Sequence, residues 1–391
     1  MSKHEVKVVR ITETIKHPNA DRLDLVPLYD GGFTAIAGLG QFKPGDLAIF
    51  IEPDYVLPMG EARWQNVPGL KKSRIRCKKI RGIPSQGLLV PADPGMQEGD
   101  DVMALLNITR YAPKVKKGGH AWLKGLVGQA ARDISFSSWQ APPPATLVVL
   151  PSYDLESIRK RVKAFQQGEE VVATEKIHGS NARFVFDEDG MHAGSREQWK
   201  KESDSCLWWT VVHQNPWVSA FCKANPHHVL YGEVFGQVQQ LKYGAGPKEI
   251  FFRVFDVRTP EGTYWQHDEL EAAFTEAQRC PVIYRGPFDF KVLQELSVGD
   301  SKVPGANHLS EGLVIRPVKS DTRAVLKLVS DRYLEKAPEE ETTSYVELEN
   351  DPLTTEVEAA LDSVDVRDLD SEQLKHLLGT LNELNEDKFE M

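Results

Sequence analysis

The sequence lacks the features that mark several large classes of protein. Its four cysteines are scattered and no two stand at CxxC spacing, so neither a disulfide scaffold nor a zinc site is expected, and a reducing cytoplasm fits best. No apolar run approaches the roughly 20 residues of a membrane-spanning helix, and the opening MSKHEVKVVR does not read as a signal peptide. A GxxxxGKS/T loop is absent as well, which argues against P-loop nucleotide binding.

Acidic side chains are concentrated at one end of the chain. The net charge is −10, but residues 337–391 carry 17 acidic and 3 basic side chains, which leaves 44 basic and 40 acidic ones elsewhere. The body is therefore mildly basic, which permits a nucleic-acid partner without requiring one. Leucines at helical spacing between Leu374 and Leu384 indicate a helical face for a protein partner. The alternative for this segment is a solvated appendage that packs only locally.

Short β-branched segments occur on both sides of a stretch rich in Pro and Gly, which predicts an α+β fold in several parts. The first segments, such as EVKVVRI and DLAIFIE, are separated by Gly, Pro and Asp turns at the spacing of a small barrel. After APPPA, strand-like segments alternate with helical ones. The expected parts are a β-barrel over residues 1–110, a linker over 111–150, a second folded domain over 151–336, and an acidic, helical extension over 337–391.

Three helices are expected before the acidic extension. A short one is predicted near residues 101–108, and another over residues 153–165. The clearest is the amphipathic segment 265–279, whose apolar residues recur at helical spacing.

One lysine stands between two predicted strands. An apolar strand leads into Thr174-Glu175-Lys176-Ile177-His178-Gly179-Ser180-Asn181, and ARFVF, DEDG and MHAGSR then form an expected hairpin that could bring Arg196 near this loop. A lysine in such a pocket becomes a nucleophile when burial and neighbouring cations lower its pKa. KxxG alone occurs by chance in many proteins, and a surface lysine at a strand end is the alternative.

Further charged side chains stand in apolar strands. Glu233 lies in YGEVFG, Phe255 ends the apolar part of FFRVFDV, and Glu311 opens SEGLVIR. Lys327 shares one face of its strand with two valines, which is costly unless the ammonium meets an anion or a carboxylate.

In this order the segments resemble the motifs of the covalent nucleotidyltransferase superfamily, which comprises DNA ligases, RNA ligases and mRNA capping enzymes. These motifs are KxxG, an arginine, GExFG, FD, EGxVI and a strand with a lysine, and here they span about 150 residues. EKIHGSN resembles RNA ligases more than the other classes, whose loop more often reads KxDG. Together with LKLVSDRYL, it resembles the ATP-dependent RNA ligase family with an OB domain ahead of its nucleotidyltransferase domain. The resemblance implies a ligase-type adenylation domain of antiparallel sheets with flanking helices.

The resemblance implies a reaction and its partners. The enzyme would seal 3′-hydroxyl and 5′-phosphate ends of RNA, at nicks in duplex RNA or RNA–DNA hybrids, through lysyl-AMP and an adenylylated 5′ end. ATP and Mg²⁺ or Mn²⁺ would be its cofactors. The alternatives are a DNA ligase, a GTP-dependent capping-type enzyme and a non-catalytic RNA-binding protein. The intact set of Lys176, Glu233, Glu311 and Lys327 argues against the last of these.

The resemblance also implies a role for each site residue. Lys176 would be the nucleophile, with its pKa held below the usual value of about 10.4 by a divalent cation and Lys327. Phe255 would stack on adenine, Glu233 would bind the ribose, and Arg196 would contact the ribose or a phosphate. Lys327 would bind the α-phosphate, and Glu311 and Glu233 would position the metal through water. Asn181 would hold a phosphate or a metal-bound water, and Glu175 and Ile177 would line the pocket.

Two positions depart from the family pattern. Val325 stands where a lysine is common, so either Arg323 substitutes for it or Lys327 acts alone. His178 replaces an aspartate, which removes one metal contact.

The N-terminal segments HPNADRLDLVPL and GLGQFKPGDLAIFIEPD resemble the tRNA-binding OB folds of some synthetases. A dense basic stretch follows, and its favoured interpretation is contact with nucleic-acid phosphates. The alternative is a solvated strand edge, which lysines often protect. The stretch consists of Lys71, Lys72, Arg74, Arg76, Lys78, Lys79 and Arg81.

Overall fold

The computed structural model describes residues 4–65, 67, 70, 72–111, 141, 150, 153–203, 206–319 and 323–336. Most of the predicted linker, the whole acidic extension and Lys71 lie outside the described residues. Residues 1–113, 151–180 and 231–340 belong to one compact unit, and residues 114–150, 181–230 and 341–391 to a second. The predicted domain boundaries stay a prediction.

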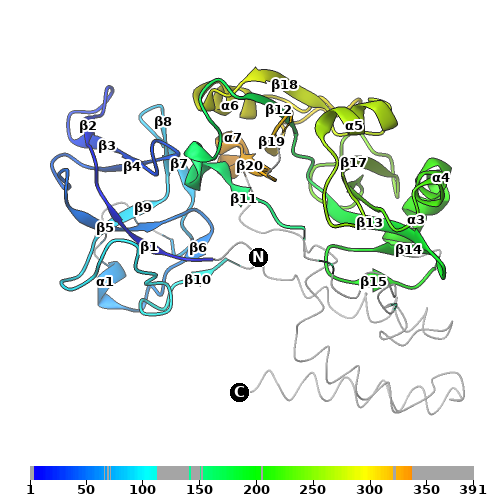
Figure 1. Cartoon of the computed structure of the whole chain (residues 1–391). Coiled ribbons are helices and arrows are strands. Elements are labelled where there is room, and N and C mark those ends of the chain that lie inside the picture. Colours follow the sequence, from blue (N-terminus) through cyan, green and yellow to red (C-terminus); the bar gives the residue numbers. More distant parts are fainter. Residues whose placement is uncertain are drawn as a thin grey trace, which may run out of the picture. The chain divides into compact units, whose positions relative to one another are not determined.

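The N-terminal part of the first unit is built from short antiparallel strands, as predicted (Figure 1). Buried and half-buried residues alternate along its longest strands, so one face of each supplies the core. Two apolar clusters fill this part, one around Trp64 and the other around Phe33 and Phe50. Its elements are β1 (Lys7–Arg10), β5 (Leu47–Ile51) and β9 (Leu88–Pro91) in one sheet, β2 (Ile15–Lys16), β3 (Leu23–Leu28) and β4 (Phe33–Gly38) in another, the pairs β6 (Tyr55–Val56) with β10 (Thr109–Arg110) and β7 (Cys77–Ile80) with β8 (Ile83–Gln86), and helix α1 (Ala62–Gln65).

A five-stranded sheet forms the centre of the rest of this unit, in the order β11-β20-β19-β12-β18. Only the β11–β20 pair is parallel. Strand β12 is buried along almost its whole length, and its apolar residues share a core with α6. The elements are β11 (Glu156–Ser157), β12 (Glu170–Glu175), β16 (Val229–Gly236), β17 (Ile250–Arg258), α5 (His267–Ala273), β18 (Val282–Pro287), α6 (Phe290–Ser297), β19 (Gly312–Pro317), β20 (Leu326–Val329) and α7 (Asp331–Lys336).

The helix expected over residues 153–165 was wrong. Its first part is strand β11, which pairs with β20, and two short 3₁₀ turns follow, η3 (Ile158–Lys160) and η4 (Val162–Ala164). Pairing with a buried strand outweighs the weak intrinsic preference for helix. Residues 103–107 form turns instead of the expected helix. Helix α5 covers only the first half of its predicted span, because Phe274 adopts an extended conformation (φ −127°, ψ 139°) and its ring is buried.

The second unit contains the predicted hairpin. Strands β13 (Ser180–Asp187) and β14 (Gly190–Gly194) pair with Asp187 opposite Gly190, and β15 (Trp199–Lys200) pairs with β14. Helices α3 (Leu207–Gln214) and α4 (Pro216–Ala224) follow. Among the described residues, no helix has the length and apolar character that crossing a membrane requires.

Candidate active site

The loop after β12 holds the predicted nucleophile by its backbone. The N–H of Lys176 donates to the carbonyl of Gly312 at 2.8 Å, and the N–H of His178 donates to the Tyr243 hydroxyl at 2.7 Å. A Cβ at position 179 would lie 2.2 Å from the carbonyl oxygen of Val234 in β16. Only glycine lets the loop pass this close to β16, so the KxxG spacing has a steric reason.

The side chain of Lys176 is paired with Glu311, a second residue that the sequence analysis predicted for the site. Its Nζ donates to Glu311 Oε1 at 2.7 Å, and the two side chains are 25% and 11% exposed. Position 312 must again be glycine, because a Cβ there would lie 2.1 Å from the Leu328 carbonyl oxygen in β20. The KxxG and EGxVI segments are brought together by the pairing of β12 with β19 and by the Lys176–Gly312 hydrogen bond, while the two glycines let them approach β16 and β20.

Lys176 and Glu311 shift each other's pKa. Burial works to lower the pKa of Lys176, but Glu311 and then Glu233 outweigh it, so the pKa is raised. Burial works to raise the pKa of Glu311, but Lys176 and His178 lower it to about 2. Among the groups of the protein itself, the Glu311 carboxylate therefore decides the direction of the Lys176 pKa, and the depressed pKa expected beside a divalent cation stays a prediction.

Lys327 lies on the face of β20 that does not enter the apolar core, since Leu326 and Leu328 fill that core. Its Nζ is 3.9 Å from Asp154 Oδ1, so the lysine does meet a carboxylate. Burial, and then the Lys176 ammonium, lower its pKa. The ammonium groups of Lys176 and Lys327 thus lie close enough to influence each other, and such a concentration of positive charge favours an anionic ligand.

The second oxygen of Glu311 provides a test of metal binding. Glu311 Oε2 is buried and accepts no hydrogen bond from the described residues, although His178 Nδ1 lies 3.4 Å away. An unsatisfied buried carboxylate oxygen suits a hydrated cation. Within the described ranges, no three His, Cys, Asp or Glu side chains are grouped as direct metal ligands, and the predicted contact through water stays a prediction.

Glu175 and Ile177 flank the lysine but point into the protein. Glu175 is fully buried, and its carboxylate accepts hydrogen bonds from Ser301 Oγ at 2.5 Å and from the Lys302 N–H at 2.7 Å. Ile177 packs in an apolar cluster with Phe235 and Tyr243. Both side chains fix the ends of the loop, and their predicted contact with a nucleotide stays a prediction.

Phe255 lies beside a buried ionic cluster whose role the sequence did not reveal. Its ring packs against Tyr153 at 4.9 Å between centroids, and its carbonyl accepts a hydrogen bond from Arg316 at 2.8 Å. The next residue, Asp256, is fully buried and accepts from the Tyr153 hydroxyl at 2.6 Å and from Arg323 at 2.7 Å. The cluster therefore fixes Phe255 in three ways: its ring is packed, its carbonyl is hydrogen-bonded, and the next residue, Asp256, is anchored.

Arg323 is committed to this cluster. Its guanidinium also lies 3.4 Å from the ring centre of Tyr264, an arrangement that stabilises the cation. The Arg323 guanidinium, which was considered above as a substitute for a second phosphate-binding lysine, is therefore already occupied by these contacts.

We expect Asp256→Asn to destabilise the protein strongly. Removing the charge leaves Arg316 and Arg323 facing an uncharged amide in a buried site, which costs about 3–5 kcal/mol of unfolding free energy. Chemical denaturation measures this loss. The matched control is Asp300→Asn, which removes an exposed pair with Arg332 (3.4 Å) and should cost less than about 1 kcal/mol. Equal losses in the two variants would contradict a supporting role for Asp256.

Two predicted site residues belong to the second unit. Asn181 accepts a hydrogen bond from Trp208 Nε1 through its carbonyl at 2.9 Å, while its Oδ1 is buried without a partner among the described residues. Arg196 is exposed and lies 3.2 Å from its neighbour Glu197. The expected approach of Arg196 to the Lys176 loop stays a prediction.

The basic stretch of the N-terminal part divides into two kinds of side chain. Arg74 donates to Asp54 from Nε and Nη2, and its guanidinium stacks 3.5 Å from the ring centre of Tyr111, so its charge is committed. Arg76 is half-buried. Lys72, Lys78, Lys79 and Arg81 are exposed.

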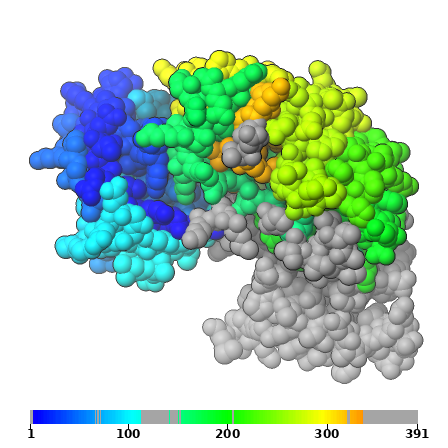
Figure 2. Space-filling view, in the orientation of Figure 1, coloured from blue at the N-terminus to red at the C-terminus, as the bar shows by residue number. Residues whose placement is uncertain are grey.

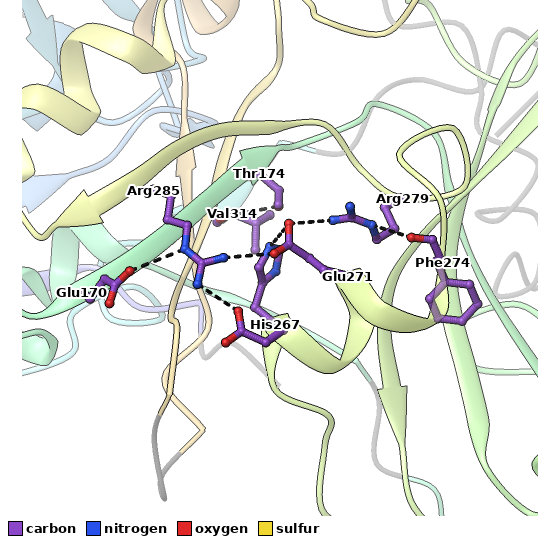
Figure 3. Close-up of polar contacts among 9 residues, drawn as sticks. Glu170, Thr174, His267, Glu271, Phe274, Arg279, Arg285 and Val314 are labelled. Carbon is purple, nitrogen blue, oxygen red and sulfur yellow. Dashed lines mark hydrogen bonds and ion pairs between the residues drawn. The ribbon is translucent and has the colours of Figure 1, made fainter.

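An ionic network near β18 is separate from these residues (Figure 3). Arg285 of β18 pairs with Glu170, Asp268 and Glu271, and Glu271 also binds Arg279. Burial, and then nearby arginines, lower the pKa of His267 to about 4, so this ring is neutral at pH 7. The network braces α5 against the edge of the central sheet.

Comparison with known proteins gives the class of the chain. Residues 169–329 match the family model described as RNA ligase, and residues 5–92 match an OB-fold domain model. The chain is therefore similar to the RNA ligase family over residues 169–329 and to an OB-fold domain over residues 5–92. A search of curated proteins finds no match.

Solved structures of one enzyme resemble the chain over most of its length. A mutant of Naegleria gruberi RNA ligase with ATP and Mn has a TM-score of 0.66 at 20% identity, covering 85% of this chain and 99% of that one. The same ligase with PPi has a TM-score of 0.65 at 20% identity, covering 86% and 99%. These similarities show the fold and confirm the predicted order of an OB domain followed by a ligase-type domain.

Proposed function

We propose that this protein is an ATP-dependent RNA ligase that joins 3′-hydroxyl and 5′-phosphate ends. The observation that carries the proposal is the Lys176 amine, held 2.7 Å from the buried carboxylate of Glu311 in a domain of the RNA ligase family. The similar Naegleria ligase structures with ATP and Mn support ATP and a divalent cation as cofactors.

The proposed reaction has three transfers. Lys176 Nζ attacks the α-phosphorus of ATP, an N–P bond forms, the bond to pyrophosphate breaks, and the amine gives up its proton. The 5′-phosphate of the RNA then attacks the same phosphorus, which breaks the N–P bond and leaves AMP on the RNA end. The 3′-hydroxyl finally attacks that 5′-phosphate and expels AMP. Such transfers depend chiefly on positioning and charge neutralisation.

The residues around Lys176 suit these needs. Lys327, on the open face of β20, would bind the α-phosphate, and Phe255, held by the Asp256 cluster, would stack on adenine. Glu233, in the strand that the loop contacts at Gly179, would bind the ribose. Arg196 and Asn181 would complete the contacts to ribose and phosphate.

Glu311 and Glu233 would hold the divalent cation through water. When bound, the cation neutralises charge on the phosphates and competes with Lys176 for the Glu311 carboxylate. Without the cation, Glu311 outweighs the effect of burial and raises the pKa of the Lys176 amine, which favours its protonated form. His178 would orient the second oxygen of Glu311.

The first test uses labelled nucleotide. Incubation of the full-length protein with α-labelled ATP and a divalent cation should transfer label to the protein, and GTP should not compete. Label from GTP alone would replace the ligase proposal by a capping-type reaction.

The substrate is tested with nicked duplexes that carry ribose or deoxyribose on each side of the nick. We expect sealing where ribose flanks the nick and weaker sealing of all-DNA nicks, because contacts to 2′-hydroxyl groups distinguish RNA from DNA. Equal sealing of all-DNA nicks would make the protein a DNA ligase.

A further inference from the structure

Unpaired positive charge is concentrated at one corner of the N-terminal part. Two segments contribute, β2 with the loop that follows it and the β7–β8 hairpin. Their cations are exposed, and none forms an ion pair within the described part of the chain. We call this set the basic corner, and it consists of Lys16, Arg22, Lys78, Lys79 and Arg81.

Other cations of the same domain have carboxylate partners. Arg10 lies 2.8 Å from Glu98, and Arg63 lies 2.5 Å from Asp93. Lys7 and Arg74 are paired in the same way, with Glu5 and Asp54. Lys43 and Arg110 are exceptions, since both are exposed without a carboxylate partner among the described residues, and Arg110 donates to His4 instead. The basic corner is therefore a local concentration of charge and not a general property of the surface.

The two segments are fixed to each other by a buried histidine. His17 is 1% exposed, and its Nδ1 accepts a hydrogen bond from the Asn19 N–H at 3.0 Å. Its Nε2 therefore carries the proton and donates to the carbonyl of Ile80 at 3.2 Å. Asn19 Nδ2 donates to the carbonyl of Arg81 at 3.0 Å. The hairpin tip is thus held against the loop after β2, so the five cations keep a defined arrangement.

Two exposed apolar side chains lie in or beside these segments. Ile15 is 46% exposed beside Lys16, and Leu39 is 56% exposed, with its N–H bonded to the carbonyl of Arg22 at 3.0 Å. None of the exposed large hydrophobic residues in the described ranges is aromatic. Single-stranded RNA is bound largely by stacking of bases on aromatic rings, whereas duplexes are bound through phosphates and 2′-hydroxyls. The corner therefore suits the backbone of a duplex.

We propose that the basic corner binds the phosphate backbone of double-stranded RNA, with His17 as the residue that positions its two halves. This inference rests on the proposed ligase function and deepens it, since it names the duplex beside the sealed end as what the OB-fold domain recognises. The segments coloured dark blue in Figure 2, which include β1 and β2, are seen at the surface of this domain. Arg74 and Arg76 lie outside the contact set, because Arg74 is committed to Asp54 and Arg76 is half-buried.

The test measures the affinity of the full-length protein for a nicked RNA duplex across a salt titration, without ATP. Each phosphate contact contributes about one unit to the slope of log affinity against log salt. Replacing Lys78, Lys79 and Arg81 by glutamine should reduce the slope by about three, and replacing Lys16 and Arg22 by about two. Lys43→Gln removes an equally exposed and unpaired charge outside the corner, and should leave the slope at its wild-type value.

His17→Gln and Asn19→Ala separate the arrangement of the charges from their number. Neither changes a cation of the corner, but both break the link to the hairpin tip, so affinity should fall several-fold and the slope should decrease. Wild-type slopes in the charge variants, an equal effect of Lys43→Gln, or tighter binding of single-stranded RNA of the same length would each overturn the proposal.

A separate measurement tests the ligase function on which this proposal rests. Uptake of AMP by each variant is measured in parallel, and it also reports on folding of the ligase domain. A wild-type protein that takes up no AMP would contradict the ligase proposal, whereas the salt slopes and the comparison of duplex with single-stranded RNA decide on the basic corner.

Discussion

Lys176→Ala should form no AMP adduct, and its ATP-dependent sealing should fall by at least about four orders of magnitude. No other amine shares its position, because backbone hydrogen bonds to Gly312 and the Glu311 ion pair fix this one side chain. Removal of a covalent nucleophile has effects of this size in other enzymes. Intact-mass spectrometry after incubation with ATP and Mn²⁺ detects the adduct directly.

Two further variants separate chemistry from folding. Lys176→Arg keeps a cation beside Glu311 but remains protonated, so it should fold normally and form no adduct. Lys291→Ala removes an exposed lysine from α6 and should form the adduct at the wild-type rate. Supplying RNA that already carries AMP at its 5′ end should restore sealing by Lys176→Ala in part, because the last transfer does not use the amine. An AMP adduct on Lys176→Ala would refute the covalent mechanism.

The sequence predicted the parts of the site that depend on local spacing. Gly179 and Gly312 stand beside Lys176 and Glu311 in sequence, and the structure shows a steric reason for each glycine. The structure places Lys176 and Glu311, which the motifs singled out separately, 2.7 Å apart, and their catalytic roles stay a prediction. The strand at β20 was also predicted, because alternation along a half-buried strand is a local property.

Contacts between residues that are far apart in the sequence could not be predicted from local spacing. Asp256 accepts from Tyr153 and Arg323, which are 103 and 67 residues away along the chain, and nothing in the separate segments links them. The FD pair was a signal for this position, but it did not identify the partners. Residues 153–165 were assigned to a helix because their pairing with β20 is equally non-local. The raised pKa of Lys176 depends on equally distant parts of the chain, because it follows from the nearby Glu311 and Glu233 carboxylates.

Glu311→Gln is expected to reduce the rate of lysyl-AMP formation about a hundredfold, the upper range for loss of a group that positions a metal. The substitution keeps the size of the side chain but removes the charge that would hold a hydrated cation. It also removes the main cause of the raised Lys176 pKa, so the residual activity should reach its plateau at a lower pH than in the wild type. Initial rates of adduct formation across a pH series measure both effects. Glu295→Gln, an exposed change on α6, is the matched control.

The same substitution has a predictable effect on stability. The pKa of Glu311 is about 2 in the folded protein against an ordinary value of 4.5. Its stabilising contribution is therefore complete above pH 4.5 and is lost as the pH falls towards 2. The raised Lys176 pKa adds stability that is present below its ordinary value of 10.5 and is lost at higher pH. Glu311→Gln should thus be less stable than the wild type at neutral pH, and the difference should shrink at acid pH. An unchanged rate profile together with an unchanged acid dependence of unfolding would show that the Lys176–Glu311 pair does not control the amine.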